Sequence, residues 1–182
     1  MKNIKLLLFL LPFLAGCRKV DDVFTKTAKD FDMIYRQPFT IPVGLSTFET
    51  HIFLFKNIAV DTAQFFRAGN LDSAQRITQI VPTSMNIRLI FNGDGNLALV
   101  RRVEVSVFDN QVSAASEKVI FYNEDVQLSS GQIPLIPLNS DLRKLLIDGN
   151  GRYTLRVKLN FREIPTRSYD VEWNATFLAK VK

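Results

Sequence analysis

Two segments near the carboxyl end of the chain alternate apolar and polar residues without interruption. The first is Tyr153–Phe161 and the second is Tyr169–Phe177, and in both every second side chain is apolar. Successive side chains of a β-strand point to opposite faces of the sheet, so each segment predicts a strand with one buried and one solvated face. The turn at Ile164-Pro165-Thr166 predicts that the two strands form an antiparallel hairpin that covers a core.

Shorter segments extend this pattern towards the amino end. Residues 33–35 and 39–43 are accompanied by prolines, which favours an edge strand. Residues 47–58 are rich in β-branched and aromatic side chains and predict a longer, well-buried strand. Residues 85–91 and 103–107 alternate, and we expect them to be neighbours in one sheet.

One segment changes to a helical pattern. Asp61 predicts the N-cap of a helix over Thr62–Ala68, with Gln64 reaching back to the amide of Asp61. Gly69-Asn70 predicts the end of this helix.

The remaining elements are short. Residues 118–122 predict one more strand, whereas Ile133–Leu138 is apolar but contains two prolines, which argues against a place in the middle of a sheet. A second short helix is expected after Ser140 and before Gly149. Its apolar stripe is formed by Leu142, Leu145 and Leu146.

Several short strands separated by turns predict an all-β protein. We expect an antiparallel β-sandwich of about seven to nine strands with one or two short helices in its connections. This domain is expected to occupy residues 31–182.

The amino terminus has the composition of an export signal. Lys2 and Lys5 precede the apolar run Leu6–Ala15, which is shorter than the roughly 20 residues that a membrane-spanning helix needs. We therefore interpret residues 1–16 as a signal peptide that is removed.

The end of that segment, Leu14-Ala15-Gly16-Cys17, resembles the lipobox of bacterial lipoproteins. The resemblance implies that Cys17 carries the lipid and becomes the first residue of the mature chain, and that residues 17–30 form a lipidated tether. Several acyl chains on one residue hold a domain at a bilayer far longer than one chain does. An ordinary cleaved signal with an incidental cysteine is the alternative.

Residues 18–23 resemble the surface-export signals of Bacteroidota lipoproteins, although a solvated tether explains them equally well. The chain as a whole is similar to a group of Bacteroidota β-sandwich lipoproteins with a lipobox and an alternating carboxyl-terminal hairpin. That similarity implies a lipid-anchored location in the cell envelope, at the outer membrane and facing either the periplasm or the surface. It implies no particular activity.

Composition limits the partners. Cys17 is the only cysteine, so the domain must be stable without disulfides. The formal net charge is +5, but the basic residues are scattered and Arg101-Arg102 is their densest pair. A nucleic-acid-binding protein has a basic stripe or patch, so we expect no nucleic-acid partner.

Few residues offer catalytic or metal chemistry. The one histidine, His51, shares strand spacing with Glu49, which makes a pH-sensitive pair conceivable, but we favour a structural or surface histidine. Zinc needs more histidine or cysteine ligands than the chain has. The turns at residues 92–96 and 148–151 lack the loop that binds calcium. We therefore expect no metal and no cofactor.

Carboxylates are the last catalytic candidates. A glycosidase needs two of them across a cleft, and Glu124 with Asp125, or Asp170 with Glu172, are the pairs available. Solvated strand faces explain both pairs as well, and we expect no enzymatic activity.

Apolar surface patches are a further possibility. Phe65-Phe66 and Ile133–Leu138 are candidates for partner docking, and Trp173 for sugar stacking, but we favour core packing for all three. We expect a lipid-anchored, non-enzymatic interaction or assembly module with an envelope protein as its partner. The alternatives are a lipoprotein that captures a glycan or an apolar small molecule, and a carboxylate-dependent hydrolase.

Overall fold

The computed structural model describes residues 28–71, 74–91, 96–109, 116–127, 131–147 and 151–182. Its elements in chain order are β1 (Phe31–Ile41), β2 (His51–Ala59), α2 (Thr62–Gly69), the 3-10 helix η3 (Ala74–Arg76), β3 (Ile77–Leu89), β4 (Val100–Asp109), β5 (Lys118–Asn123), β6 (Gln132–Pro137), α3 (Arg143–Leu146), β7 (Arg152–Phe161) and β8 (Tyr169–Val181). The predicted signal peptide, Cys17 and most of the tether lie outside the described residues.

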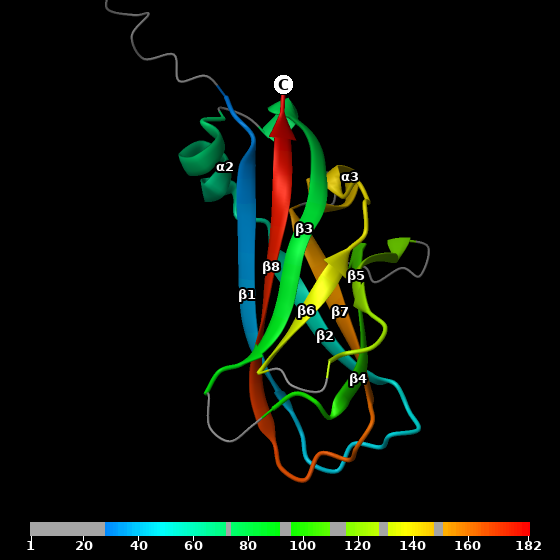
Figure 1. The fold of residues 1–182 in the computed structure, drawn as a ribbon. Helices are drawn as coiled ribbons and strands as arrows, with labels where there is room; N and C mark the ends of the chain where they lie inside the picture. Colours follow the sequence, from blue (N-terminus) through cyan, green and yellow to red (C-terminus); the bar gives the residue numbers. More distant parts are fainter. Residues whose placement is uncertain (1–27, 72–73, 92–95, 110–115, 128–130, 148–150) are drawn as a thin grey trace, which may run out of the picture.

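The strands form one antiparallel sheet that curls over on itself (Figure 1). Its order is β1-β8-β3-β6-β5-β4-β7-β2, and each pair of neighbours is antiparallel. Two four-stranded halves, β1-β8-β3-β6 and β5-β4-β7-β2, are joined where β5 pairs with β6. The prediction of an all-β, antiparallel fold with short helices is confirmed, and the eight strands follow the order of a jelly roll.

The predicted hairpin between the two alternating carboxyl-terminal segments is wrong. β7 pairs with β2 and β4, whereas β8 pairs with β1 and β3, so the two strands lie in opposite halves. Alternation specifies which face of a strand is buried, but it does not specify which strand lies beside it. Residues 162–168 carry the chain across the core from one half to the other.

The core fills the space between the halves. Tyr153, Leu155, Val157 and Trp173 are among the side chains that are almost completely buried. Aromatic rings meet across the core, with centroids 5.8 Å apart for Tyr35 and Tyr153 and 6.0 Å apart for Phe121 and Phe177. Full burial of one such side chain stabilises the fold by about 1.5–3 kcal/mol. These contacts hold together two halves that share few backbone hydrogen bonds.

The edges of the sheet are β1 and β2. The prediction of an edge strand near residues 33–43 is confirmed, although β1 is one continuous strand in which Pro38 lies opposite Glu172. The prediction of a well-buried strand over residues 47–58 is wrong, because β2 begins at His51, lies at the other edge and is mostly exposed. A bulge near Asn57, which has a φ of 59°, shifts its register against β7.

Two other predictions about the arrangement of the strands are wrong. β3 and β4 are not neighbours, since the chain crosses between the halves after β3. β6 lies in the middle of the sheet despite Pro134 and Pro137, at the place where the sheet bends. The prolines are tolerated because β6 forms only four residue pairs with β3 and two with β5.

The helices lie close to their predicted positions. α2 begins after Asp61, whose side chain accepts a hydrogen bond from the amide of Ala63, and ends at Asn70, which has a left-handed conformation. Gln64 donates to the Asp61 carboxylate rather than accepting from its amide. No helix in the described part of the chain is long and apolar enough to cross a membrane.

The short helix α3 buries Leu142, Leu145 and Leu146, as predicted. Its first turn is capped by Asp141 instead of Ser140: the Asp141 carboxylate accepts from the amide of Arg143 at 3.0 Å and from that of Ile80 in β3 at 3.1 Å. Asp141 therefore fixes α3 to the sheet.

Gly69 leaves room for an aromatic ring. A Cβ at this position would lie 2.6 Å from two ring carbons of Phe31, which itself packs against Phe65. We expect Gly69→Ala to lower the free energy of unfolding by about 1–3 kcal/mol through overpacking, measured by chemical denaturation. Gly131→Ala is the control, because a Cβ there meets nothing within 4 Å, and we expect a change within about 0.5 kcal/mol. A more stable Gly69→Ala variant would contradict the close contact.

Candidate ligand-binding cleft at the loop end

Four connections converge at one end of the sheet, at the bottom of Figure 1. They are the β1–β2, β3–β4, β5–β6 and β7–β8 connections, and we call this region the loop end. β1 begins and β8 ends at the opposite end of the molecule. The jelly-roll order produces this arrangement, because strands in opposite halves are joined across the same end of the core.

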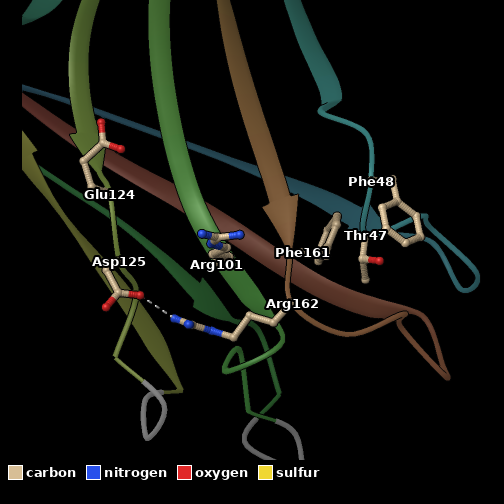
Figure 2. Close-up of a pocket in the computed structure, with 7 residues that line it drawn as sticks. All are labelled: Thr47, Phe48, Arg101, Glu124, Asp125, Phe161 and Arg162. Carbon is tan, nitrogen blue, oxygen red and sulfur yellow. Dashed lines mark hydrogen bonds and ion pairs between the residues drawn. The ribbon is translucent and has the colours of Figure 1, made fainter.

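An open cleft of about 680 Å³ lies at the loop end (Figure 2). It is lined by Thr47, Phe48, Arg101, Glu124, Asp125, Phe161 and Arg162. A second cavity of about 500 Å³ shares much of this lining and adds Thr50, Arg102 and Asn160. The cleft thus combines aromatic rings, guanidinium groups, carboxylates, hydroxyls and an amide.

Arg101 enters the cleft because β4 has a bulge at this residue. Val100 lies opposite Phe161 and Arg102 lies opposite Asn160, so Arg101 has no partner residue in β7. A bulge changes the direction in which a side chain points and often lies beside a functional site. Figure 2 shows Arg101 between the two carboxylates on one side and the two aromatic rings on the other.

Arg162 has a different role, because its guanidinium donates hydrogen bonds to three groups. It donates to the carbonyl of Ala98 at 3.2 Å, to the carboxylate of Asp125 at 3.0 Å and to the carbonyl of Val126. These groups belong to the β3–β4 and β5–β6 connections. Arg162 therefore holds together three of the four connections at the loop end.

Phe48 is 97% exposed, yet its loop is anchored. The amide of Phe48 donates to the hydroxyl of Ser46 at 3.1 Å, and the ring of His51 lies 2.8 Å from the carbonyl of Ser46. The amide of Gly44 donates to the carbonyl of Pro165 in the β7–β8 connection at 2.8 Å. An exposed phenyl ring on a tethered loop is a preorganised contact surface, since ordering costs are already met in the free protein.

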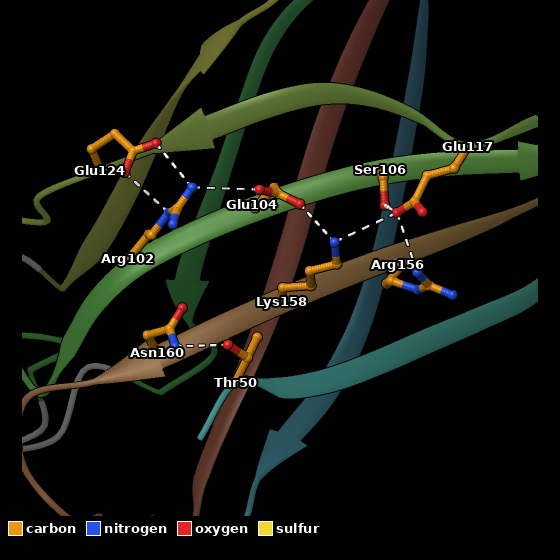
Figure 3. A network of polar contacts seen from close by, with 9 residues as sticks. All are labelled: Thr50, Arg102, Glu104, Ser106, Glu117, Glu124, Arg156, Lys158 and Asn160. Carbon is orange, nitrogen blue, oxygen red and sulfur yellow. Dashed lines mark hydrogen bonds and ion pairs between the residues drawn. The ribbon is translucent and has the colours of Figure 1, made fainter. Parts of the chain in front are cut away.

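The cleft continues into a row of charges on the outer face of β4 and β7 (Figure 3). Arg102 pairs with Glu124 at 3.0 Å and with Glu104 at 3.6 Å, and Glu104 pairs with Lys158 at 2.7 Å. Glu117 then contacts Lys158 at 3.6 Å. Alternating signs keep this face close to neutral, and Arg102, where the row meets the cleft, is paired with two carboxylates.

Glu117 is the most constrained carboxylate of this row. Burial alone would raise the pKa of Glu117, but the hydrogen bond from Ser106 at 2.7 Å and the charges of Lys158 and Arg156 outweigh burial. The pKa of Glu117 is therefore held below its usual value of 4.5.

Each of the candidate catalytic carboxylates is already ion-paired or hydrogen-bonded to another side chain. Glu124 and Asp125 both line the cleft but are adjacent in sequence and paired with different arginines. At the other predicted pair, Asp170 accepts from the hydroxyl of Thr40 at 2.7 Å and Glu172 pairs with Arg88 at 2.8 Å. Neither arrangement places two unpaired carboxylates across a cleft.

His51 is a structural residue beside the cleft. Its ring packs against Phe161 with centroids 5.4 Å apart, and it contacts the carbonyl of Ser46 rather than Glu49, which is exposed in the preceding loop. No group of three or more histidine, cysteine, aspartate or glutamate side chains suited to a metal occurs among the described residues. Residues 92–95 and 148–150 of the two candidate calcium turns, and the lipidation candidate Cys17, lie outside that set.

Of the apolar residues considered for partner docking or sugar stacking, some lie in the core and others are exposed. Trp173 is buried, as favoured, and packs against Phe55 with ring centroids 5.7 Å apart. Phe65 is buried, but its neighbour Phe66 is 58% exposed. The Ile133–Leu138 run is mixed in the same way, with its inward side chains buried and its outward ones exposed.

Sequence reasoning missed the residues that shape the cleft. In the sequence Arg101 is only half of a basic pair, because a bulge leaves no mark in the sequence. The composition around Phe48 predicts a buried strand, whereas Phe48 lies exposed in a loop. Glu124 and Asp125 are the cleft residues that the sequence does single out, as one of two candidate carboxylate pairs, and both line the cleft.

No family model matches the chain, and no curated protein matches it. Weakly similar solved structures include Cocksfoot mottle virus (11% identity, 87% of each chain covered, TM-score 0.29) and turnip yellow mosaic virus (13%, 84% of this chain and 95% of that chain, TM-score 0.30). Another is the CBM22-1–GH10 part of a Clostridium thermocellum xylanase (12%, 77% and 26%, TM-score 0.26). TM-scores this low indicate neither a shared family nor a shared function.

The hydrogen bonds that Arg162 donates predict that its side chain stabilises the folded state. We expect Arg162→Ala to lower the free energy of unfolding by about 1–3 kcal/mol, because it leaves the Ala98 and Val126 carbonyls without their charged donor. Arg101→Ala is the matched control at the same cleft, with an expected change within about 0.5 kcal/mol. Equal losses in the two variants, measured by denaturant unfolding, would contradict the different roles of these arginines.

The lowered pKa of Glu117 predicts a pH dependence. The folded state favours the ionised carboxyl, so its stabilisation is complete above the ordinary pKa of 4.5 and is lost as pH falls through the lower folded value. We expect Glu117→Gln to flatten the fall of unfolding free energy with decreasing pH below about 4.5. Glu163→Gln, which replaces an exposed carboxylate, serves as the control. Parallel profiles for wild type and Glu117→Gln would contradict this assignment.

Proposed function

We propose that the chain is a lipid-anchored, non-enzymatic binding module of the bacterial envelope, held at the outer membrane through Cys17. Its partner is an envelope protein, which it recognises with the loop end. The observation that carries this proposal is the arrangement of the two ends of the molecule. β1 begins at one end, and the β1–β2, β3–β4 and β7–β8 connections, which carry several exposed apolar residues, lie at the other (Figure 1).

The length of β1 would separate the loop end from a membrane anchor at the amino end of the domain. β1 runs from Phe31 to Ile41, and at about 3.3 Å per residue it spans roughly 35 Å. A lipid on Cys17 would hold the start of β1 near the membrane. The loop end would then project away from the bilayer.

The loop end has the composition of a contact surface. Its exposed apolar side chains are Val43, Phe48, Ile90, Phe91 and Ile164. Single exposed apolar residues are ordinary, but several on connections that meet at one end suggest a partner. The Gly44–Pro165 hydrogen bond links two of these connections and keeps Val43 near Ile164.

A protein surface fits this end better than an anionic membrane. Membrane docking would need a cluster of basic residues around the apolar side chains. Glu49, Glu163 and Arg167 are all exposed in the same connections as Phe48 and Ile164, and Arg162 is already paired. The mixed charges favour a partner with its own complementary charges.

The cleft supports a second candidate function, the capture of a small ligand or a glycan. The specific observation is that one open cleft is lined by both the exposed Phe48 ring and the Arg101 guanidinium. A hydrolase has less support, because Glu124 and Asp125 are both ion-paired.

In-cell crosslinking tests the first candidate. With an affinity tag at the carboxyl terminus, we expect a stoichiometric envelope protein to co-purify with the wild-type chain and to be reduced several-fold by Phe48→Ala. Phe66→Ala is the matched control, since Phe66 is also an exposed phenylalanine but lies on α2 at the opposite end.

Cys17→Ala supplies the unanchored control, in which the partner should be lost. A partner that survives both Phe48→Ala and Cys17→Ala would contradict the proposed geometry. Recovery of the chain alone from every sample would contradict the interaction module and favour the ligand-binding candidate.

A further inference from the structure

The cleft carries one unbalanced positive charge. The two cavities are lined by three guanidinium groups, from Arg101, Arg102 and Arg162, and by two carboxylates, from Glu124 and Asp125. Arg102 pairs with Glu124, and Arg162 pairs with Asp125. Within the described residues, Arg101 alone of the three has neither an ion pair nor a hydrogen bond from its side chain.

An unpaired guanidinium in a cleft favours a ligand that carries a carboxylate. Its planar fork of donors matches a carboxylate, which it binds through two parallel hydrogen bonds. The bulge in β4 holds the backbone of Arg101, whose carbonyl accepts from the amide of Val126 at 2.9 Å. The side chain therefore reaches into the cleft from a fixed base.

The other walls indicate what carries the carboxylate. Phe48 offers a flat, exposed ring, on which the apolar C–H face of a sugar ring can be buried. Thr47, Thr50 and Asn160 add hydroxyl and amide groups, and Asn160 donates to Thr50 at 2.9 Å. Such groups suit the hydroxyls of a sugar better than the side chains of an apolar peptide.

The cleft is also open. Its two cavities share Thr47, Phe48, Arg101, Glu124 and Phe161 and lie on the outside of the loop end. A ligand there is not enclosed, so neighbouring units of a polymer can extend beyond the cleft in either direction. Small-molecule sites, by contrast, bury most of the ligand.

We infer that this cleft binds an acidic sugar unit within a polysaccharide, with its carboxylate on Arg101 and its ring face on Phe48. The inference rests on the second candidate function, capture of a ligand, and does not require a protein partner. It adds the chemical class of the ligand, a uronate-type glycan, and assigns the carboxylate to one residue.

Isothermal titration calorimetry of the full-length chain in detergent tests the inference. The probes are tetragalacturonate, a neutral galactose tetrasaccharide and tetraglutamate. We expect tetragalacturonate to bind more tightly than the other two, and Arg101→Gln to weaken it by about tenfold or more, as loss of a charge-assisted hydrogen-bonded pair does. Arg36→Gln, at an exposed arginine on β1, should change the affinity by less than about twofold.

A second variant separates stacking from charge. Phe48→Ala should weaken the acidic and the neutral tetrasaccharide alike, whereas Arg101→Gln should affect only the acidic one. Absence of tetragalacturonate binding, equal effects of Arg101→Gln and Arg36→Gln, or tighter binding of tetraglutamate would each overturn the inference. None of these results bears on crosslinking to an envelope protein, so the two proposals fail separately.

Discussion

Burial of one face of every strand between the two halves of the sheet is the interaction on which this structure depends. The halves share only the sparse β5–β6 pairing, so contacts across the core, such as Phe55 with Trp173 and Tyr35 with Tyr153, must hold them together. The domain has no disulfide to assist, because Cys17 is the only cysteine. A strand pattern that buries large aromatic rings is thus both the fold signal and the main source of stability.

The surface that we propose as functional follows from the same topology. Because the chain passes repeatedly from one half to the other, four connections meet at the loop end and residues distant in sequence become neighbours. Arg162 joins three connections, and the Gly44–Pro165 hydrogen bond joins the first to the last. On this frame Phe48 stays exposed and the bulge at Arg101 leaves its guanidinium unpaired.

The sequence predicted local structure better than pairing. The alternation in β7 and β8, the Asp61 cap of α2 and the leucine stripe of α3 are local signals, and the structure has each of them. The hairpin between β7 and β8 was wrong because a short link joins strands across a core as readily as beside each other. The cleft was beyond prediction, since its central residue owes its direction to a bulge that only the register of β4 against β7 reveals.

The central claim is that the loop end, opposite the start of β1, is the surface that meets the partner. Site-specific photo-crosslinking in living cells tests it most directly, with the photoreactive residue placed at position 48 or 164 of the loop end, or at position 66 on α2. We expect a discrete crosslinked product from positions 48 and 164 and none from position 66. A product from position 66 alone, or equal products from all three positions, would contradict it.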